Sequence, residues 1–155
     1  MDPLSEIRAY LRLAPDLGTS GQPTAPQFAA IRDAGFELVV NLALATSPTA
    51  LPDEEAVVRA AGLSYVHIPI DFQAPDMPSA LQFFEVLRQR RGRPTFVHCI
   101  ANFRVSALVY AFRVAHGESE SAARADLEKL WTPDAVWQKY IEDVVRAAGA
   151  SRTIG

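Results

Sequence analysis

Hydrophobic and polar positions along the chain form two kinds of pattern. Short, nearly continuous apolar runs at 36–44, 63–70 and 94–98 lie between glycine, proline and polar clusters, which is typical of buried strands. Longer segments place apolar residues at helical spacing, at 25–34, 53–61, 104–115, 119–130 and 133–148, and a further helix precedes the 94–98 strand. The alternation predicts an α/β protein with a central, mostly parallel sheet flanked by helices, and a C-terminal helical segment.

The N-terminal residues show a less regular pattern. Apolar positions from Leu4 to Leu13 fit a short amphipathic helix. The stretch from Leu17 to Pro23 is typical of a short edge strand that ends in a turn, because Gly21 and Pro23 cannot both lie inside a central ladder.

Composition limits the classes of protein that fit this pattern. A chain of 155 residues with 49% hydrophobic content suits one compact domain, residues 1–155. With 15 Lys and Arg against 18 Asp and Glu, nothing favours a nucleic acid or an anionic membrane as partner. We expect a cytoplasmic protein, because no apolar run is long enough to span a bilayer and the first residues lack the features of a secretory signal. The oligomeric state stays open.

The single cysteine, Cys99, bears on redox and metal chemistry. One cysteine excludes an internal disulfide framework and a thiolate metal cage. The three histidines do not have metal-ligand spacing, so we expect neither a metal nor another cofactor.

The stretch Pro94-Thr-Phe-Val-His-Cys-Ile-Ala-Asn-Phe-Arg-Val-Ser106 carries the candidate chemistry. A buried strand ends at His98 and Cys99, and a helix begins near Arg104. A loop between a strand end and a helix start directs several backbone N–H groups into one concavity, with the helix dipole behind them. We therefore predict an anion site formed by the loop. Its residues are Ile100, Ala101, Asn102 and Phe103.

Cys99 stands at the mouth of this predicted site. The N–H groups that hold an anionic substrate also stabilise a thiolate, which makes the cysteine a nucleophile at neutral pH. Arg104 can place its planar guanidinium over the loop and hold two oxygens of a phosphate or sulfate. The alternative is that Cys99 is a small buried hydrophobic residue. An ordered set of His98, Cys99, Arg104 and the Ser106 hydroxyl is not required by a purely structural turn, so we favour the chemical interpretation.

This stretch resembles the signature loop of the cysteine-dependent protein tyrosine phosphatase superfamily. That superfamily usually has five residues between Cys and Arg, whereas four separate Cys99 from Arg104. Four is common in rhodanese-type loops and in a bacterial phosphatase-like family of unknown function that is also found fused in beta-lactamase hydrolase-like proteins. Ser106 keeps the usual offset of the hydroxyl from Cys99, and Asn102 replaces the usual glycine as a residue that tolerates a left-handed backbone.

Two further stretches carry the resemblance. Ser20-Gly-Gln-Pro23 resembles the opening of the same bacterial family. The strand Tyr65-Val-His-Ile-Pro-Ile-Asp71 resembles the dual-specificity phosphatases, in which the loop after this strand supplies the general-acid aspartate. The resemblance therefore implies a dual-specificity-phosphatase-like fold over roughly residues 17–117.

We interpret the chain as a phosphatase that hydrolyses phosphate monoesters through a cysteinyl-phosphate, with phosphotyrosine among the candidate substrates. Cys99 is the nucleophile, and Arg104 and the loop N–H groups bind the phosphate. Asp71 is our choice of general acid, with Asp76 in reserve, because Asp71 directly follows the strand and matches the position in the resembled family. Ser106 is expected to assist release of the thiolate. His98 is expected to orient the loop from beneath, and a plain core histidine is the alternative.

Two other functions fit the same residues. A rhodanese-like sulfurtransferase would carry a persulfide on Cys99 and would need no general acid. A non-catalytic module would bind a phosphorylated protein or small molecule without turnover. Arg88, Arg90, Arg91 and Arg93 form either a solvated face or a basic surface that attracts an anionic substrate toward the pocket. Asn41, at the end of a predicted strand, is assigned a structural role.

Overall fold

A five-stranded sheet forms the centre of the computed structural model, which describes residues 2–154 and side chains as far as residue 149. Its strands, in spatial order, are β1 (Leu11–Ala14), β2 (Leu17–Ser20), β5 (Thr95–His98), β3 (Leu38–Asn41) and β4 (Ser64–His67). β2, β5, β3 and β4 are parallel, and β1 pairs antiparallel with β2. The predicted α/β class and mostly parallel sheet are confirmed.

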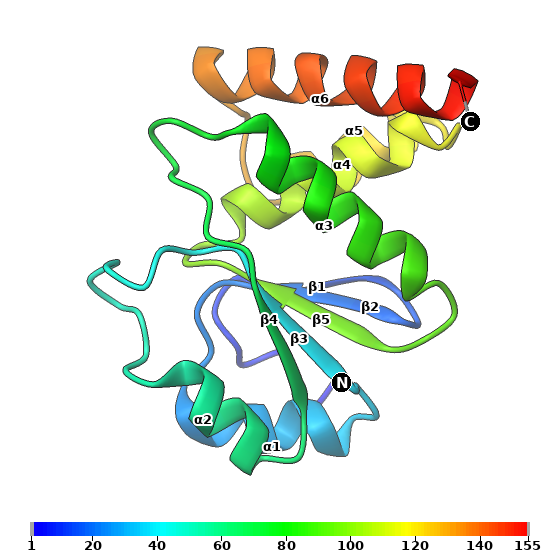
Figure 1. The fold of residues 1–155 in the computed structure, drawn as a ribbon. Helices are drawn as coiled ribbons and strands as arrows, with labels where there is room; N and C mark the ends of the chain where they lie inside the picture. Colours follow the sequence, from blue (N-terminus) through cyan, green and yellow to red (C-terminus); the bar gives the residue numbers. More distant parts are fainter. Residues whose placement is uncertain (1, 155) are drawn as a thin grey trace.

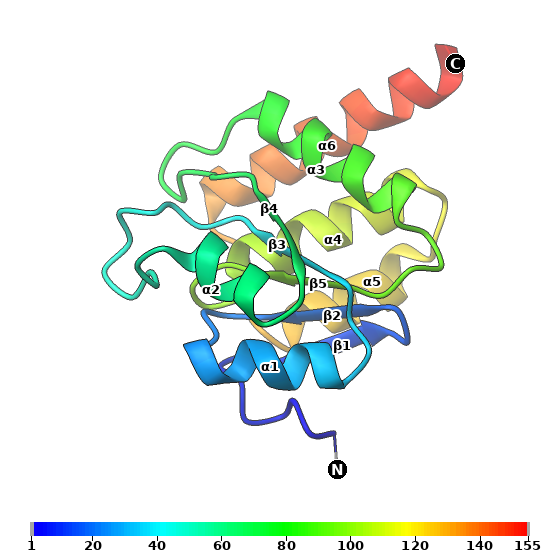
Figure 2. The same cartoon turned by 60° about the horizontal axis from the view of Figure 1, so that its bottom comes forward.

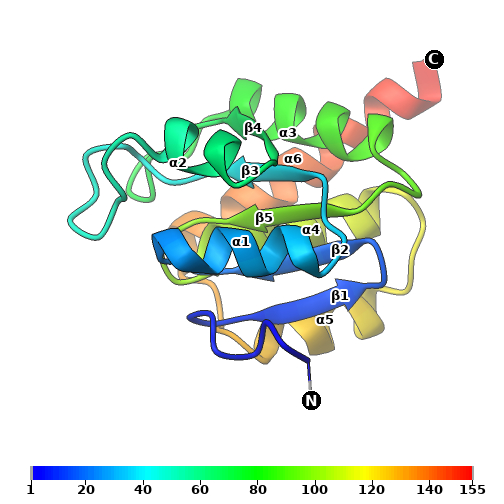
Figure 3. The same cartoon turned by 90° about the horizontal axis from the view of Figure 1, so that it is seen from below.

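Helices cover both faces of the sheet. Their bounds are α1 (Ala25–Asp33), α2 (Glu54–Ala60), α3 (Met77–Gln89), α4 (Phe103–Ala115), α5 (Glu120–Glu128) and α6 (Ala135–Ile154). α1 and α2 lie on one face, and α3, α4 and α5 lie on the other, with α6 outside α3 and α4 (Figure 1). Figure 2 and Figure 3, in which α1 comes forward, show the sheet between these two layers. No helix among residues 2–154 is long and apolar enough to cross a membrane.

The N-terminal segment corrects the sequence prediction. Residues 3–9 form successive turns, and the predicted helix from Leu4 to Leu13 is wrong, because Ala9 adopts a left-handed backbone with φ of 53° and the chain then enters β1. Pairing of Leu11 with Thr19 supplies backbone hydrogen bonds that a helix would have made locally. β2 is therefore an interior strand, and the predicted edge position is also wrong.

The core has two parts, one on each side of the sheet. The larger part lies among α3, α4, α5 and α6, and the smaller lies beneath α1 and α2. β5 contributes to both parts, since Phe96 belongs to the smaller cluster and Val97 to the larger. Side chains on both faces of β5 are therefore buried, as a central parallel strand requires. The rigid β5 strand leads directly into the loop that carries Cys99.

Candidate active site

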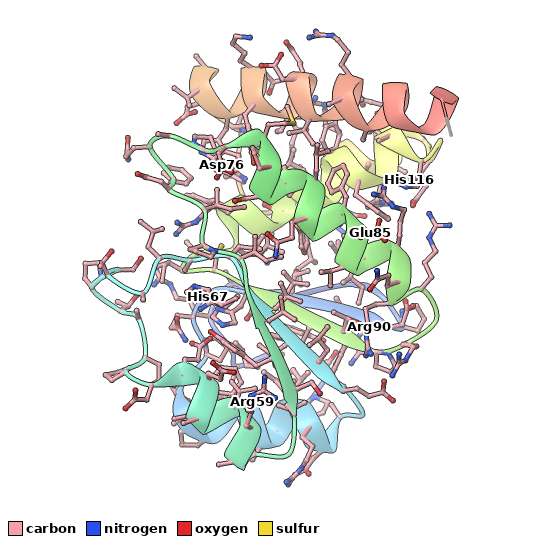
Figure 4. All side chains as sticks on the ribbon, viewed as in Figure 1. Arg59, His67, Asp76, Glu85, Arg90 and His116 are labelled. Atoms are coloured by element: carbon pink, nitrogen blue, oxygen red, sulfur yellow. The ribbon has the colours of Figure 1, made fainter. Side chains whose placement is uncertain are left out.

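The carboxyl ends of β3, β4 and β5 meet at one edge of the sheet, where the loop of residues 99–102 joins β5 to α4 (Figure 1). Ligand sites of open parallel sheets lie outside these carboxyl ends. His67, which ends β4, is labelled at this edge in Figure 4. The topology thus places the predicted anion loop and the Asp71 loop at the same end of the molecule.

Cys99 is buried, with 1% of its surface exposed, and it directly follows β5. Its backbone N–H donates to the carbonyl of Ser20 at 3.3 Å, which extends the pairing of β5 with β2. The side chain is a free thiol that also packs in the larger core cluster. A nucleophile in this position is screened from bulk water by the residues around it.

Two consecutive carbonyls of the loop are held from beneath. Nδ1 of His98 lies 3.0 Å from the carbonyl oxygen of Cys99, and the backbone N–H of Gln22 donates to the carbonyl of Ile100 at 3.0 Å. Because a trans peptide directs its C=O and the following N–H to opposite sides, the N–H groups of Ile100 and Ala101 point away from His98 and Gln22. No described residue accepts a hydrogen bond from either N–H. These two donors are available to an anion.

Asn102 holds the turn from the loop into α4. It has φ of 66° and ψ of 12°, the left-handed conformation that the sequence analysis expected this asparagine to tolerate. Its buried Nδ2 donates to the carbonyl of Ala9 at 2.9 Å and to Oγ1 of Thr19 at 3.0 Å. The amide side chain therefore anchors the loop to β2 and to the N-terminal turns, in addition to permitting the turn.

The Ser20-Gly-Gln-Pro23 motif needs a glycine at position 21 because it packs closely against the loop. A Cβ atom at position 21 would lie 2.3 Å from the carbonyl oxygen of Ile100, which is closer than any real contact. A glycine lets the β2–α1 connection approach the loop closely enough for the N–H of Gln22 to reach Ile100. The motif is therefore part of the support of the anion loop.

Arg104 lies in the first turn of α4 and is 7% exposed. Its Nη1 donates to the carbonyl of Ile70 at 2.9 Å, its Cζ lies 5.6 Å from the centre of the Phe72 ring, and its Nε is buried with no partner. No carboxylate among the described residues is a partner of the Arg104 guanidinium. A buried guanidinium without a counter-charge favours the binding of an anion.

The two candidate acids differ in what they already bind. Asp71 directly follows Ile70, the residue that Arg104 contacts, and its exposed carboxylate accepts only the N–H of Gln73 at 2.9 Å. Asp76 caps α3 by accepting the N–H of Ser79 at 2.9 Å. Asp71 is thus the neighbour in sequence of the residue whose carbonyl Arg104 binds, whereas Asp76 caps a helix.

The structure does not join Ser106 to Cys99. The hydroxyl of Ser106 donates to the carbonyl of Phe103 at 3.2 Å and accepts from Nε1 of Trp131 at 3.1 Å. Serine inside a helix commonly bonds the carbonyl of the preceding turn in this way. The indole of Trp131 stacks on the ring of Phe103 with 4.5 Å between centroids, so this serine helps to fix an aromatic wall beside the loop.

One buried polar residue near the loop was missed by the sequence analysis. Glu54, at the start of α2, accepts hydrogen bonds from Gln22, Tyr65 and His98. In the sequence Glu54 is one of several acids at a helix start, and nothing local marks it as buried. Asn41 has the structural role expected of it, since its Oδ1 accepts the N–H of Ala43 and its Nδ2 donates to Tyr65.

The basic segment of residues 88–93 lies at the opposite end of the sheet from Cys99. Arg90 and Arg93 line a cavity of about 380 Å³ together with Thr95, the first residue of β5, and His116, which follows α4. Figure 4 shows Arg90 and His116 on the side of the molecule away from His67. The suggestion that these arginines attract a substrate toward Cys99 is therefore wrong, because β5 and α4 separate the two ends.

No group of three or more His, Cys, Asp and Glu side chains suited to a metal ion occurs among the described residues. The groups that can bind a ligand at the loop are backbone N–H groups and a guanidinium. Both kinds of donor suit a tetrahedral oxyanion.

Comparison with known proteins identifies the family. The model of a family described as a DSP-PTPase phosphatase fused to NAD+ kinase matches residues 16–143, which include β2, the anion loop and most of the helices. The chain belongs to this phosphatase family. It is accordingly a hydrolase of the dual-specificity phosphatase type, and the resemblance found in the sequence is confirmed. No curated protein matches the chain significantly.

Solved structures show the same fold. The DUF442 phosphatase of Shewanella putrefaciens is 33% identical, with 94% of this chain and 97% of that chain covered and a TM-score of 0.83. TpbA of P. aeruginosa, in complex with pTyr, is 18% identical over 95% of this chain and 91% of that chain, with a TM-score of 0.73. The PP-IP phosphatase SIW14 of S. cerevisiae, in complex with citrate, is 14% identical over 95% and 94%, with a TM-score of 0.72. The last two are similar to this chain in fold.

Proposed function

We propose that this phosphatase hydrolyses phosphate monoesters in two steps through a cysteinyl-phosphate on Cys99. The observation that carries the proposal is a pair of unpaired loop N–H groups that follow Cys99, together with a buried guanidinium at the start of the next helix. The N–H groups of Ile100 and Ala101 have no acceptor among the described residues, and the buried Arg104 has no carboxylate partner. Such a set binds the phosphate oxygens and stabilises the charge that develops on them during transfer.

In the first step the thiolate of Cys99 attacks phosphorus. The S–P bond forms while the P–O bond to the leaving group breaks, and Asp71 gives its proton to the departing oxygen. Asp71 suits this task because its carboxyl group is exposed and lies in the loop whose Ile70 carbonyl is held by Arg104. Substrate binding at Arg104 therefore brings the leaving group toward the Asp71 loop.

In the second step a water molecule attacks the phosphorus and the S–P bond breaks. Asp71, now ionised, takes a proton from the water, and inorganic phosphate leaves together with the regenerated thiolate. Ser106 can donate to the departing thiolate only after its hydroxyl leaves the carbonyl of Phe103. We therefore assign Ser106 a smaller role than Cys99, Arg104 or Asp71.

Aryl phosphates, including phosphotyrosine, are the substrate class that we propose. Phe72, Phe103 and Trp131 are half-buried and pack against one another beside Arg104, which gives the site an aromatic wall. A highly phosphorylated substrate would favour a basic surround, but the basic segment of residues 88–93 lies at the other end of the sheet. The pTyr complex of TpbA, a protein of the same fold, is consistent with this choice.

Cys99→Ser tests the proposed function. A serine hydroxyl keeps the shape of the site but is a far weaker nucleophile, so hydrolysis of p-nitrophenyl phosphate should be lost while binding of inorganic phosphate remains. Phosphatase assays and phosphate titration measure the two properties.

Each rival function predicts a different result in these assays. Thiosulfate turnover with cyanide, without phosphate release, would identify a sulfurtransferase. Phosphate binding without turnover in the wild-type protein would identify a binding module. Comparable hydrolysis by Cys99→Ser would remove Cys99 from the mechanism.

A further inference from the structure

A buried carboxylate lies on the side of the anion loop opposite the proposed substrate. Glu54, the first residue of α2, is 7% exposed. Its Oε1 accepts from Nε2 of Gln22 at 2.7 Å, and its Oε2 lies 3.0 Å from the hydroxyl of Tyr65 and 2.7 Å from Nε2 of His98. These partners come from the β2–α1 connection, β4 and β5. A carboxylate in so buried a place requires compensating donors, and here it has three.

The hydrogen-bond partners decide where the protons of this cluster lie. The hydroxyl of Tyr65 accepts from Nδ2 of Asn41, so its own proton is directed to Glu54. Burial raises the pKa of Tyr65, which keeps the phenol protonated. Burial also raises the pKa of Glu54. The hydrogen bond and charge interaction with His98, and the hydrogen bonds from Gln22 and Tyr65, outweigh this effect, so the pKa of Glu54 lies below its ordinary value. Glu54 is therefore ionised at neutral pH.

The His98 ring faces a hydrogen-bond acceptor at each of its two nitrogens. Nδ1 faces the carbonyl of Cys99, which only accepts, and Nε2 faces the ionised carboxylate of Glu54. Glu54 and Tyr65 are the titratable side chains in this cluster, and the ring of Phe28 from α1 lies 6.0 Å from that of His98. The fully buried ring of His98 is therefore held between Glu54 and the peptide of Cys99.

Glu54 also links the two groups that orient the loop. His98 binds the carbonyl of Cys99, the backbone of Gln22 binds the carbonyl of Ile100, and the side chains of both residues end on the same carboxylate. Fixing those two carbonyls directs the N–H groups of Ile100 and Ala101 to the other side. The side chain of Glu54 thus controls the direction of two backbone N–H groups that it does not contact.

We infer that Glu54 is a positioning residue of the anion loop, which holds His98 and Gln22 in place beneath Cys99 and Ile100. The His98 ring lies between Glu54 and the peptide of Cys99. The inference rests on the proposed function for the role of Cys99, but anion binding and thiol reactivity test it without turnover. Nothing in the local sequence distinguishes Glu54 from Glu55.

Glu54→Gln is the decisive variant, and Glu55→Gln is its matched control. The first keeps the size of the side chain and loses the charge, whereas Glu55 is 61% exposed at the next position of the same helix, where it pairs with Arg59 at 2.9 Å. Cys99 is the single cysteine, so iodoacetamide alkylation as a function of pH reports its thiolate alone. Protection from alkylation by inorganic phosphate reports anion affinity, and kcat/KM for p-nitrophenyl phosphate reports catalysis.

We expect Glu54→Gln to weaken phosphate protection and kcat/KM by about tenfold to a hundredfold, the range for losing hydrogen bonds to a charged group. Its alkylation curve should move to higher pH, because the loop N–H groups that stabilise the thiolate are no longer held in place. Glu55→Gln should match the wild-type protein in all three measurements. In a His98→Asn background, Glu54→Gln should have a smaller further effect than in the wild-type protein, because only the contact with Gln22 then remains to link Glu54 to the loop.

A lower melting temperature for Glu54→Gln with unchanged phosphate protection and an unchanged alkylation curve would overturn the inference and leave Glu54 a merely structural residue. If Glu54→Gln does not fold, Gln22→Met is the variant that tests the inference. It removes the side-chain donor to Glu54 but keeps the backbone N–H that binds Ile100, and unaltered phosphate protection in this variant would also overturn the inference. Loss of protection in Glu54→Gln, with a wild-type protein that binds phosphate but does not hydrolyse esters, would sustain the inference and reject the proposed function.

Discussion

The two ends of the β5–α4 unit both carry arginines, but in opposite electrostatic settings. At the amino end of β5, Arg90 pairs with Glu37 at 3.0 Å, and near the end of α4 Arg113 pairs with Asp126 at 2.7 Å. At the carboxyl end Arg104 is buried and contacts a neutral carbonyl and an aromatic ring. The paired arginines are already neutralised within the protein. On electrostatic grounds, a buried cation without a carboxylate partner is therefore a stronger candidate for an anion site than a segment of paired basic residues.

The same comparison applies to the loop itself. The N–H groups of Ile100 and Ala101 face outward because the carbonyls of the same two peptides are bound by His98 and Gln22 on the inner side. The glycine at position 21 allows the backbone at Gln22 to come close enough to the loop for this contact. At the other end of the unit the cavity is lined by charged residues that include Arg90, Arg93 and Asp16. Variants at the two ends should therefore differ in their effect on anion chemistry.

The largest effect in this comparison is expected from the proposed general acid. Asp71→Asn should slow hydrolysis of alkyl phosphates by about 10²–10⁴-fold, because a poor leaving group needs a proton, and nitrophenyl esters much less. Asp76→Asn is the matched control, since asparagine also caps a helix and should leave both rates unchanged. Steady-state kinetics on the two ester classes measure this contrast. The reverse pattern would transfer the role of acid to Asp76.

Arg104→Lys should lower kcat/KM for aryl phosphates by about 10²–10³-fold and weaken inhibition by phosphate, because a point charge cannot replace the planar, two-pronged guanidinium at a developing oxyanion. Arg90→Lys, at the other end of β5, should change neither quantity. Inhibition constants for phosphate and initial rates supply the comparison. Equal effects of the two substitutions on kcat/KM and on inhibition by phosphate would contradict the proposed difference between the buried and the paired arginine.

The smallest effect is expected on the free energy of unfolding, from the ion pair between Arg113 and Asp126. Hydrogen bonds from Arg113 and Lys129 lower the pKa of Asp126 below its usual value of 3.8. The depressed pKa means that the pair stabilises the fold above pH 3.8 and that this contribution is lost as the pH falls through the folded value. Asp126→Asn should cost less than about 1 kcal/mol at pH 7, because the pair is partly solvated.

Thermal unfolding at several pH values measures that cost. The difference between Asp126→Asn and the wild-type protein should shrink in acid, where the wild-type carboxyl is protonated as well, and phosphatase activity at pH 7 should be unchanged. A difference in stability that does not depend on pH would show that the ion pair is not its source.

Much of the fold and the chemistry could be predicted from local sequence. Helices and strands followed from the spacing of apolar residues, with the bounds of α1, β5 and α4 close to those expected. The loop with Cys99 and Arg104 was recognisable because a strand, a short loop and a helix are consecutive in the chain. The left-handed backbone of Asn102 was predictable for a similar reason, since it is a property of one residue type.

Contacts between distant segments were decided by the tertiary structure. The residues from Leu4 to Leu13 have apolar spacing that suits a helix, yet Leu11–Ala14 pair with β2 and form a strand. Glu54 and Glu55 are adjacent acids at one helix start, but only Glu54 is directed toward Gln22 and His98. Local sequence determines backbone preference and residue chemistry, whereas burial and hydrogen-bond partners depend on which segments the sheet brings together.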